Sequence, residues 1–265
     1  MKYKFTLSLL ASLLTIGFSN SNAQAQSSFA GFYGQVSTGY ESNQLGTFSG
    51  ASIDTPNLNT DTKGSGPSQT FGGAPLVLGI GYYWQVSEKW LIGVGADYSA
   101  ITQTSSNISQ TVSNAMGNTS LVAGETRIGN GETVQLSNRF NLFLTPAYAI
   151  DKDKLVYLKA GYSQVTAQYN RSTSFTNTLN GVSTTSPAKP GENPSSNQGG
   201  YLVGLGYKQM IMSGLYGFAE GNFMGYSAPS YVQTSAVGAT GSKTIVPNFS
   251  SLNTYQFLVG VGYAF

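Results

Sequence analysis

The chain has 265 residues, with 17 tyrosines, 14 phenylalanines and 33 glycines, no cysteine, no histidine and only 9% charged residues. The lack of cysteine excludes a disulfide framework, and the lack of histidine excludes Ser-His-Asp and Cys-His catalysis and most zinc sites. Because disorder goes with few aromatic residues, we expect the chain to fold, mostly as β-structure.

The N-terminus has the order of a secretory signal peptide: Lys2 and Lys4, an apolar run over 5–18, and then Ala23-Gln24-Ala25. We predict that residues 1–25 are a signal peptide cleaved after Ala25, with cleavage after Ala23 as the second choice. No apolar run reaches the roughly 20 residues of a membrane-spanning helix, so any membrane insertion must use strands. Without Lys2 and Lys4, 11 basic residues stand against 11 acidic ones, which argues against a nucleic-acid partner.

Eight segments alternate apolar with small or polar residues at the period of two that a β-strand has. They cover residues 30–40, 75–84, 90–99, 133–149, 155–168, 200–209, 215–226 and 255–265. Several contain Gly-x-Gly, which also occurs in nucleotide-binding loops, but no helical apolar period follows any of them. Pro146 cannot donate a ladder hydrogen bond, so we predict a bulge or the end of pairing there.

The connections between these segments alternate in length. Three are about five residues long, and four are roughly 25 to 35 residues long and rich in Ser, Thr, Asn and Gly. Short periplasmic turns and long external loops are typical of outer-membrane barrels. The sequence therefore predicts an all-β fold, an eight-stranded antiparallel up-and-down transmembrane β-barrel over 26–265 with four long external loops. A hairpin within a loop could instead raise the strand count to ten.

The charged residues test this interpretation, because the apolar residues alone set the facing of each strand. All five charges within the strands fall on the face opposite the apolar one, with a chance of roughly one in thirty if each were random. A soluble, lipocalin-like barrel would show the opposite polarity. We expect these residues to form a barrel-interior charge network, with each acid near a basic partner: Asp97, Arg139, Lys159, Lys208 and Glu220.

Aromatic residues mark the ends of the predicted strands. Near the short turns we predict interfacial aromatics at Trp84, Trp90 and Tyr148, and near the long loops at Tyr40, Tyr98 and Tyr226. The last strand carries a large apolar face that ends the chain: Tyr255, Phe257, Val259, Val261, Tyr263 and Phe265.

The exported N-terminus, the eight alternating strands, the inward charges and the terminal Tyr-Ala-Phe resemble the small OmpA-like and Opa-like eight-stranded outer-membrane barrels. The resemblance covers the whole mature chain. It implies that the apolar face of the last strand is a C-terminal assembly signal read by the barrel-assembly machinery. The chain stops at Phe265, so the peptidoglycan-binding domain of full OmpA-like proteins has no counterpart here.

Our first hypothesis is a structural or surface-interaction protein in the cell outer membrane, which contacts unknown ligands through its external loops. An eight-stranded barrel is about wide enough for its own side chains, which argues against a wide pore. The alternative is a narrow porin-like channel for small or apolar solutes, favoured by the space that the inward glycines leave. The barrel enzymes that the resemblance suggests depend on histidine, so we expect no enzyme activity. We also expect no metal, no cofactor, and a monomer surrounded by outer-membrane lipid.

Overall fold

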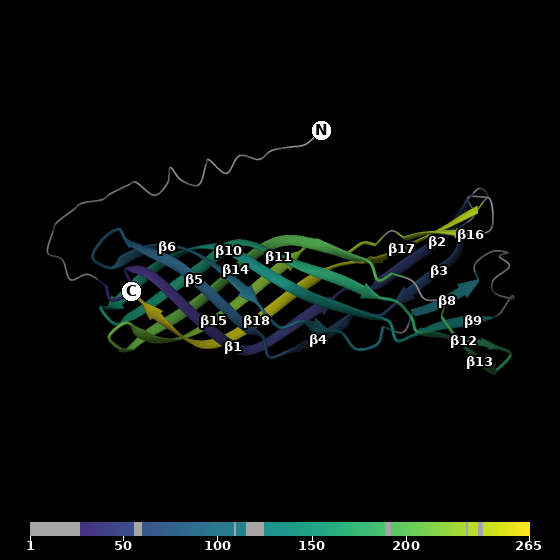
Figure 1. The fold of residues 1–265 in the computed structure, drawn as a ribbon, viewed down its shortest axis with the longest axis horizontal. Coiled ribbons are helices and arrows are strands. Elements are labelled where there is room, and N and C mark those ends of the chain that lie inside the picture. The colour runs from purple at the N-terminus through teal and green to yellow at the C-terminus, as the bar shows by residue number, and fades with distance from the viewer. Residues whose placement is uncertain are drawn as a thin grey trace, which may run out of the picture.

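The computed structural model describes residues 27–55, 60–108, 110–114, 125–188, 192–231, 233–237 and 241–265. All the regular secondary structure in these ranges is β (Figure 1). Among the described residues, no helix has the length and apolar character needed to cross a bilayer. The predicted signal peptide lies outside the described residues.

Eight antiparallel strands form a closed ring in which each strand pairs with the next along the chain and the last pairs with the first (Figure 1). The fold class is therefore the one predicted, and most strand bounds differ from the prediction by a few residues. The ring strands are β1 (Gly31–Leu45), β5 (Leu76–Gln85), β6 (Trp90–Ser99), β10 (Thr133–Asp151), β11 (Lys154–Asn170), β14 (Ser195–Met212), β15 (Leu215–Tyr226) and β18 (Leu252–Ala264).

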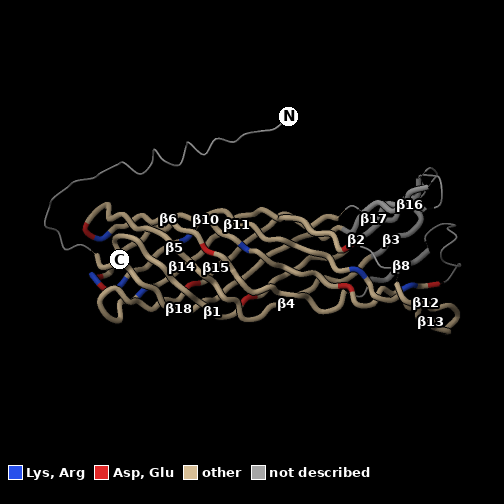
Figure 2. Tube along the Cα trace, viewed as in Figure 1, with Lys and Arg blue, Asp and Glu red and all other residues tan. Residues whose placement is uncertain are grey.

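The outer wall of the ring is apolar because alternate side chains of each strand point outward. Phe32, Ile80 and Leu205 are 62, 68 and 62% exposed, whereas their sequence neighbours on the inner face are buried or half-buried. Such a wall suits hydrocarbon rather than water. Charged residues are sparse along the ring, and several lie at the short-turn end (Figure 2).

The long loops contain paired strands of their own. Four hairpins, one from each loop, join edge to edge in a second antiparallel sheet, the loop sheet, at the end of the molecule away from the short turns (Figure 1). Hairpins within the loops, which the sequence analysis considered, are thus present, but they do not join the ring, which keeps eight strands. The loop-sheet strands are β2 (Phe48–Thr55), β3 (Thr60–Gly66), β8 (Gln110–Asn114), β9 (Thr126–Asn130), β12 (Ser174–Leu179), β13 (Val182–Pro187), β16 (Gln233–Val237) and β17 (Gly241–Phe249).

The wall is irregular where the ring meets the loops. Short strands β4 (Gln69–Gly73) and β7 (Gln103–Thr104) continue the pairing of β1 and β10 beyond the ends of β5 and β6. On β10 a bulge lies between Ser137 and Phe140, where Asn138 has a φ of 51°. At Pro146 the ladder to β11 is interrupted without a change of register, while pairing to β6 continues. Of the two predicted outcomes, there is no bulge at the proline, and pairing is lost on the β11 side only.

Candidate functional site

The lumen of the ring is filled by buried side chains, and the five predicted interior charges are among them. None of the five is more than 4% exposed: Asp97, Arg139, Lys159, Lys208 and Glu220.

Lys159 is the centre of the first ionic group. Its Nζ lies 2.7 Å from Oδ2 of Asp97 and 2.8 Å from Oε1 of Glu220, so one cation serves two carboxylates from opposite sides of the ring. Tyr157 and Asn222 each donate a further hydrogen bond of 2.7 Å to Glu220. A buried ion pair is stable only when such hydrogen bonds satisfy its remaining oxygens. Both acids thus have a basic partner, but they share it.

Arg139 forms the second ionic group with an acid that the sequence reasoning missed. Its guanidinium pairs with Glu41 and donates to Asn43 Oδ1 and to Tyr226 OH, at 3.0 Å each. Gln256 donates to the same carboxylate at 2.7 Å. The predicted first strand ended at residue 40, whereas β1 continues to Leu45, so Glu41 lay just outside the prediction. Continued alternation of that strand would have placed Glu41 inside.

Lys208 forms no ion pair within the described part of the chain. Its Nζ lies 4.0 Å from the ring centroid of Tyr33 and 4.7 Å from that of Tyr216, and it donates to Gln35 Oε1 at 3.2 Å. Aromatic faces stabilise a desolvated ammonium, so rings replace the expected carboxylate here. Three more rings stand within 6.0 Å: those of Tyr83, Tyr157 and Phe218.

Apolar layers close the lumen on both sides of the ions. Towards the loops, a buried cluster runs from the ring into the loop sheet, with Leu136, Leu202, Met224 and Leu252 at most 2% exposed. Towards the short turns, Phe29 packs with its ring centroid 5.8 Å from that of Tyr216, as part of a second buried cluster. The chain segment before β1 therefore covers the short-turn mouth.

Neighbouring rings occupy the space that the inward glycines leave. A Cβ added to Gly206 would lie 2.2 Å from the ring of Tyr157, and one added to Gly262 would lie 2.3 Å from the ring of Tyr216. Gly95 similarly faces the ring of Phe143. These glycines make room for aromatic side chains from adjacent strands, so they do not outline an open passage.

The outward residues of the last strand lie on the barrel wall. The exposed fraction is between 46 and 80% for Tyr255, Phe257, Val259, Val261, Tyr263 and Phe265. Trp84 and Trp90 are also exposed, and the ring of Tyr148 packs 5.2 Å from that of Trp90. Tyr40 and Tyr98 are outward as predicted, but the prediction for Tyr226 was wrong. Tyr226 has the same parity as Glu220 on β15 and therefore points inward, where it binds Arg139.

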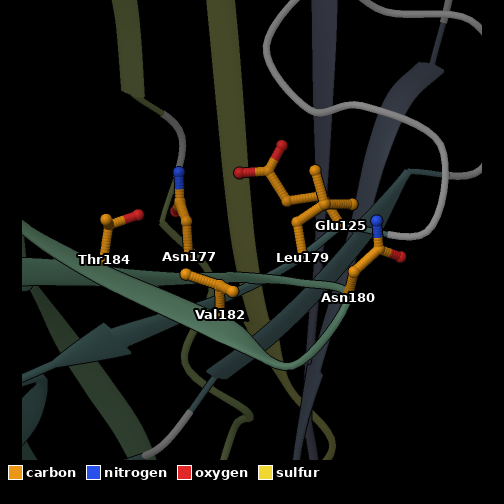
Figure 3. Close-up of a pocket in the computed structure, with 6 residues that line it drawn as sticks. All are labelled: Glu125, Asn177, Leu179, Asn180, Val182 and Thr184. Atoms are coloured by element: carbon orange, nitrogen blue, oxygen red, sulfur yellow. The ribbon is translucent and has the colours of Figure 1, made fainter.

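The loop sheet carries an open depression of about 450 Å³ on one face of the β12–β13 hairpin (Figure 3). Two cross-strand pairs form its floor, Asn177 with Thr184 and Leu179 with Val182, and Asn180 lies at the hairpin turn. Glu125 reaches over it from the start of β9 and is the one ionisable residue among the six that line it. The six residues that line this depression carry amide, hydroxyl, aliphatic and carboxylate groups, which is not the nucleophile-and-base pair of a hydrolase.

Glu132 is a buried acid outside the ring, between β9 and β10. It is 3% exposed, and its carboxylate accepts a hydrogen bond from the hydroxyl of Ser172 in the third long loop. Burial raises the pKa of Glu132, against the lowering effect of this hydrogen bond and of the charge on Arg171. The second and third long loops thus meet at a buried carboxyl whose pKa is raised.

The sequence matches no protein-family model, and a comparison with curated proteins also finds no match. Solved structures of similar shape include three bacterial outer-membrane proteins. Ail, the attachment invasion locus protein of Yersinia pestis, has 10% identity over 89% of this chain and 99% of its own, with a TM-score of 0.34. The outer membrane protease OmpT from Escherichia coli has 10% identity over 89% of this chain and 97% of its own, with a TM-score of 0.45. OprG from Pseudomonas aeruginosa has 13% identity over 91% of this chain and 99% of its own, with a TM-score of 0.42. These values limit the likeness to general barrel architecture.

Proposed function

We propose that this protein is an integral outer-membrane barrel that serves as a surface-interaction platform. The barrel anchors it in the lipid, and the loop sheet makes the contacts outside the cell. The predicted signal peptide and the apolar outer wall support export and membrane insertion. In this arrangement the short turns and the C-terminus face the periplasm, and the last strand presents its apolar face to the barrel-assembly machinery.

The filled lumen is the observation that carries the proposal. From one mouth to the other, the ring holds a buried apolar cluster, two ionic groups and a buried aromatic cluster. A solute would have to displace Lys159 from two carboxylates, and exposing a single buried charge to an apolar surround is costly. The same observation disfavours the narrow channel considered from the sequence.

A role in binding fits the loop sheet better than a role in catalysis. The chain has no histidine, and the six described residues that line the depression include one ionisable group, so this depression offers no acid–base pair of the kind hydrolases use. We therefore propose that it is not an enzyme. Its partners would be outer-membrane lipid around the wall of a monomer and an external ligand on the loops.

Planar-bilayer recording on refolded protein tests the proposal. We expect insertion without steady single-channel steps, because the ionic and apolar layers leave no continuous water path. Insertion is checked separately by protease treatment of the same protein refolded into vesicles, which should spare the ring strands. Reproducible conductance steps from protein that has inserted would contradict a filled lumen and favour the channel.

A further inference from the structure

The three short turns differ sharply in chemistry. The β5–β6 and β10–β11 turns are charged, whereas the β14–β15 turn carries Ile211 and Met212 and no charge. Ile211 and Met212 are 59 and 63% exposed, which is unusual for apolar side chains at a turn that faces water. The charged residues of the other two turns are Glu88, Lys89, Asp151, Lys152, Asp153 and Lys154.

The apolar turn is continuous with the end of the chain. Met212 pairs with Leu215, and Leu215 pairs with Tyr263 on β18. The rings of Tyr263 and Phe265 pack 5.1 Å apart, and Phe265 is 80% exposed. We call the exposed set Ile211, Met212, Tyr263 and Phe265 the apolar rim.

The charged turns occupy the arc of the mouth beside the apolar turn, and the β10–β11 turn borders it, because Met210 N donates to the carbonyl oxygen of Asp153. Strands β6 and β10 are neighbours in the ring, so the two charged turns stand next to each other. The carboxylate of Asp151 lies 2.8 Å from Nζ of Lys154, and Lys152 and Asp153 stand 3.9 Å apart in exposed positions. The short-turn mouth therefore has a charged half and an apolar half.

We propose that the apolar rim is a membrane-contact surface, immersed in the acyl chains of the inner leaflet, so that the barrel is tilted with its β14–β15–β18 side deeper in the bilayer. The occupant is lipid because the rim extends the lipid-facing wall, directly from Val261 on β18 and, on β14, from Leu205 with one polar side chain, Gln209, in between. Charged turns cannot enter hydrocarbon at low cost, so an upright barrel would leave the rim in water. The inference rests on the proposed membrane-spanning role.

Site-directed spin labelling tests the rim directly, because the chain has no cysteine and each introduced one is the sole label site. The rim variants are Ile211→Cys and Met212→Cys. The matched turn variants on the charged half are Ser87→Cys and Lys152→Cys. Each is refolded alone into phosphatidylcholine vesicles, and relaxation by oxygen, which concentrates in hydrocarbon, is compared with relaxation by a water-soluble nickel chelate.

We expect oxygen to dominate at 211 and 212 and the nickel chelate to dominate at 87 and 152. Equal nickel accessibility at all four positions would overturn the inference. So would exclusion of both relaxants from 211 and 212, because the rim would then be covered by protein. Leu205→Cys, on the outer wall of the barrel, distinguishes failure of the proposed tilt from failure of the proposed function. Nickel accessibility at 205 would refute the membrane-spanning barrel. Oxygen accessibility at 205 supports the barrel, and the results at 211 and 212 then decide the tilt.

Discussion

Two lysines of this chain form equally short ion pairs, one buried in the lumen and one exposed to water. Lys159 and Lys154 both lie within 2.8 Å of a carboxylate oxygen. The Lys159 side chain is 1% exposed and that of Lys154 is 43% exposed. Water screens the second pair, so distance alone does not measure its contribution to stability. In the lumen, away from water, the charge of Lys159 is balanced by the carboxylates of Asp97 and Glu220.

Replacing Lys159 with methionine should lower the free energy of unfolding by about 3–5 kcal/mol, because Asp97 and Glu220 would remain buried without a cation. The urea midpoint in detergent micelles measures this change. The matched control is Lys154→Met, which removes an equally short but exposed ion pair and should leave the midpoint almost unchanged. Similar midpoints for the two variants would show that the lumen is hydrated rather than closed.

The contact between Glu132 and Ser172 should make loop protection depend on pH. Because burial raises the pKa of Glu132, the folded contact is fully stable below the ordinary value of about 4.3 and weakens as pH rises through the raised pKa. Hydrogen exchange over residues 169–179, corrected for the intrinsic pH effect, should therefore speed up over that interval. Glu132→Gln should abolish the dependence, and an unchanged slope in this variant would refute the assignment.

On the inner face of the ring, paired residues of neighbouring strands complement each other in side-chain size, with glycine opposite an aromatic residue. Gly206 pairs with Tyr157, whose hydroxyl is held by Glu220 at 2.7 Å. The ring cannot move away without losing that hydrogen bond. Inward glycines such as Gly206 are thus part of the packing of the lumen, whereas an added Cβ on the outward Gly221 would have no atom within 4 Å.

Gly206→Ala should cost about 1–3 kcal/mol of stability, because the added methyl overpacks against a fixed ring. Gly221→Ala is the matched control on the lipid-facing side and should be neutral, since its Cβ meets open space. Urea midpoints of the two variants give the comparison. A neutral Gly206→Ala would imply free volume beside Tyr157, which the filled lumen does not allow.

The period of two was enough to predict the ring strands and the facing of their charges, because one slip of register reverses every side chain. It was not enough where strand ends were uncertain. Glu41 lay one residue past a predicted end, and the parity of Tyr226 was overlooked at the end of β15. The loop sheet was not predicted, because its Ser- and Thr-rich segments lack the regular apolar alternation that marks the ring strands in the sequence.

At the scale of the whole molecule, the chain has two surfaces of different composition. The wall between the turns and the loops is apolar and uniform, and the loop sheet is polar and built from four separate insertions. Hydrogen bonds close the ring completely, which removes the unpaired edges that an open sheet would expose to lipid. Such closed barrels resist unfolding in detergent, so unheated protein should migrate differently from boiled protein on a gel.

The central claim is that the apolar side chains of the ring face lipid, and the two tryptophans, Trp84 and Trp90, report on it without any mutation. The decisive measurement is quenching of their fluorescence in vesicles, by brominated acyl chains and by aqueous acrylamide. We predict strong quenching by the brominated chains and weak quenching by acrylamide. Strong quenching by acrylamide, with no response to the brominated chains, would contradict the membrane-spanning barrel.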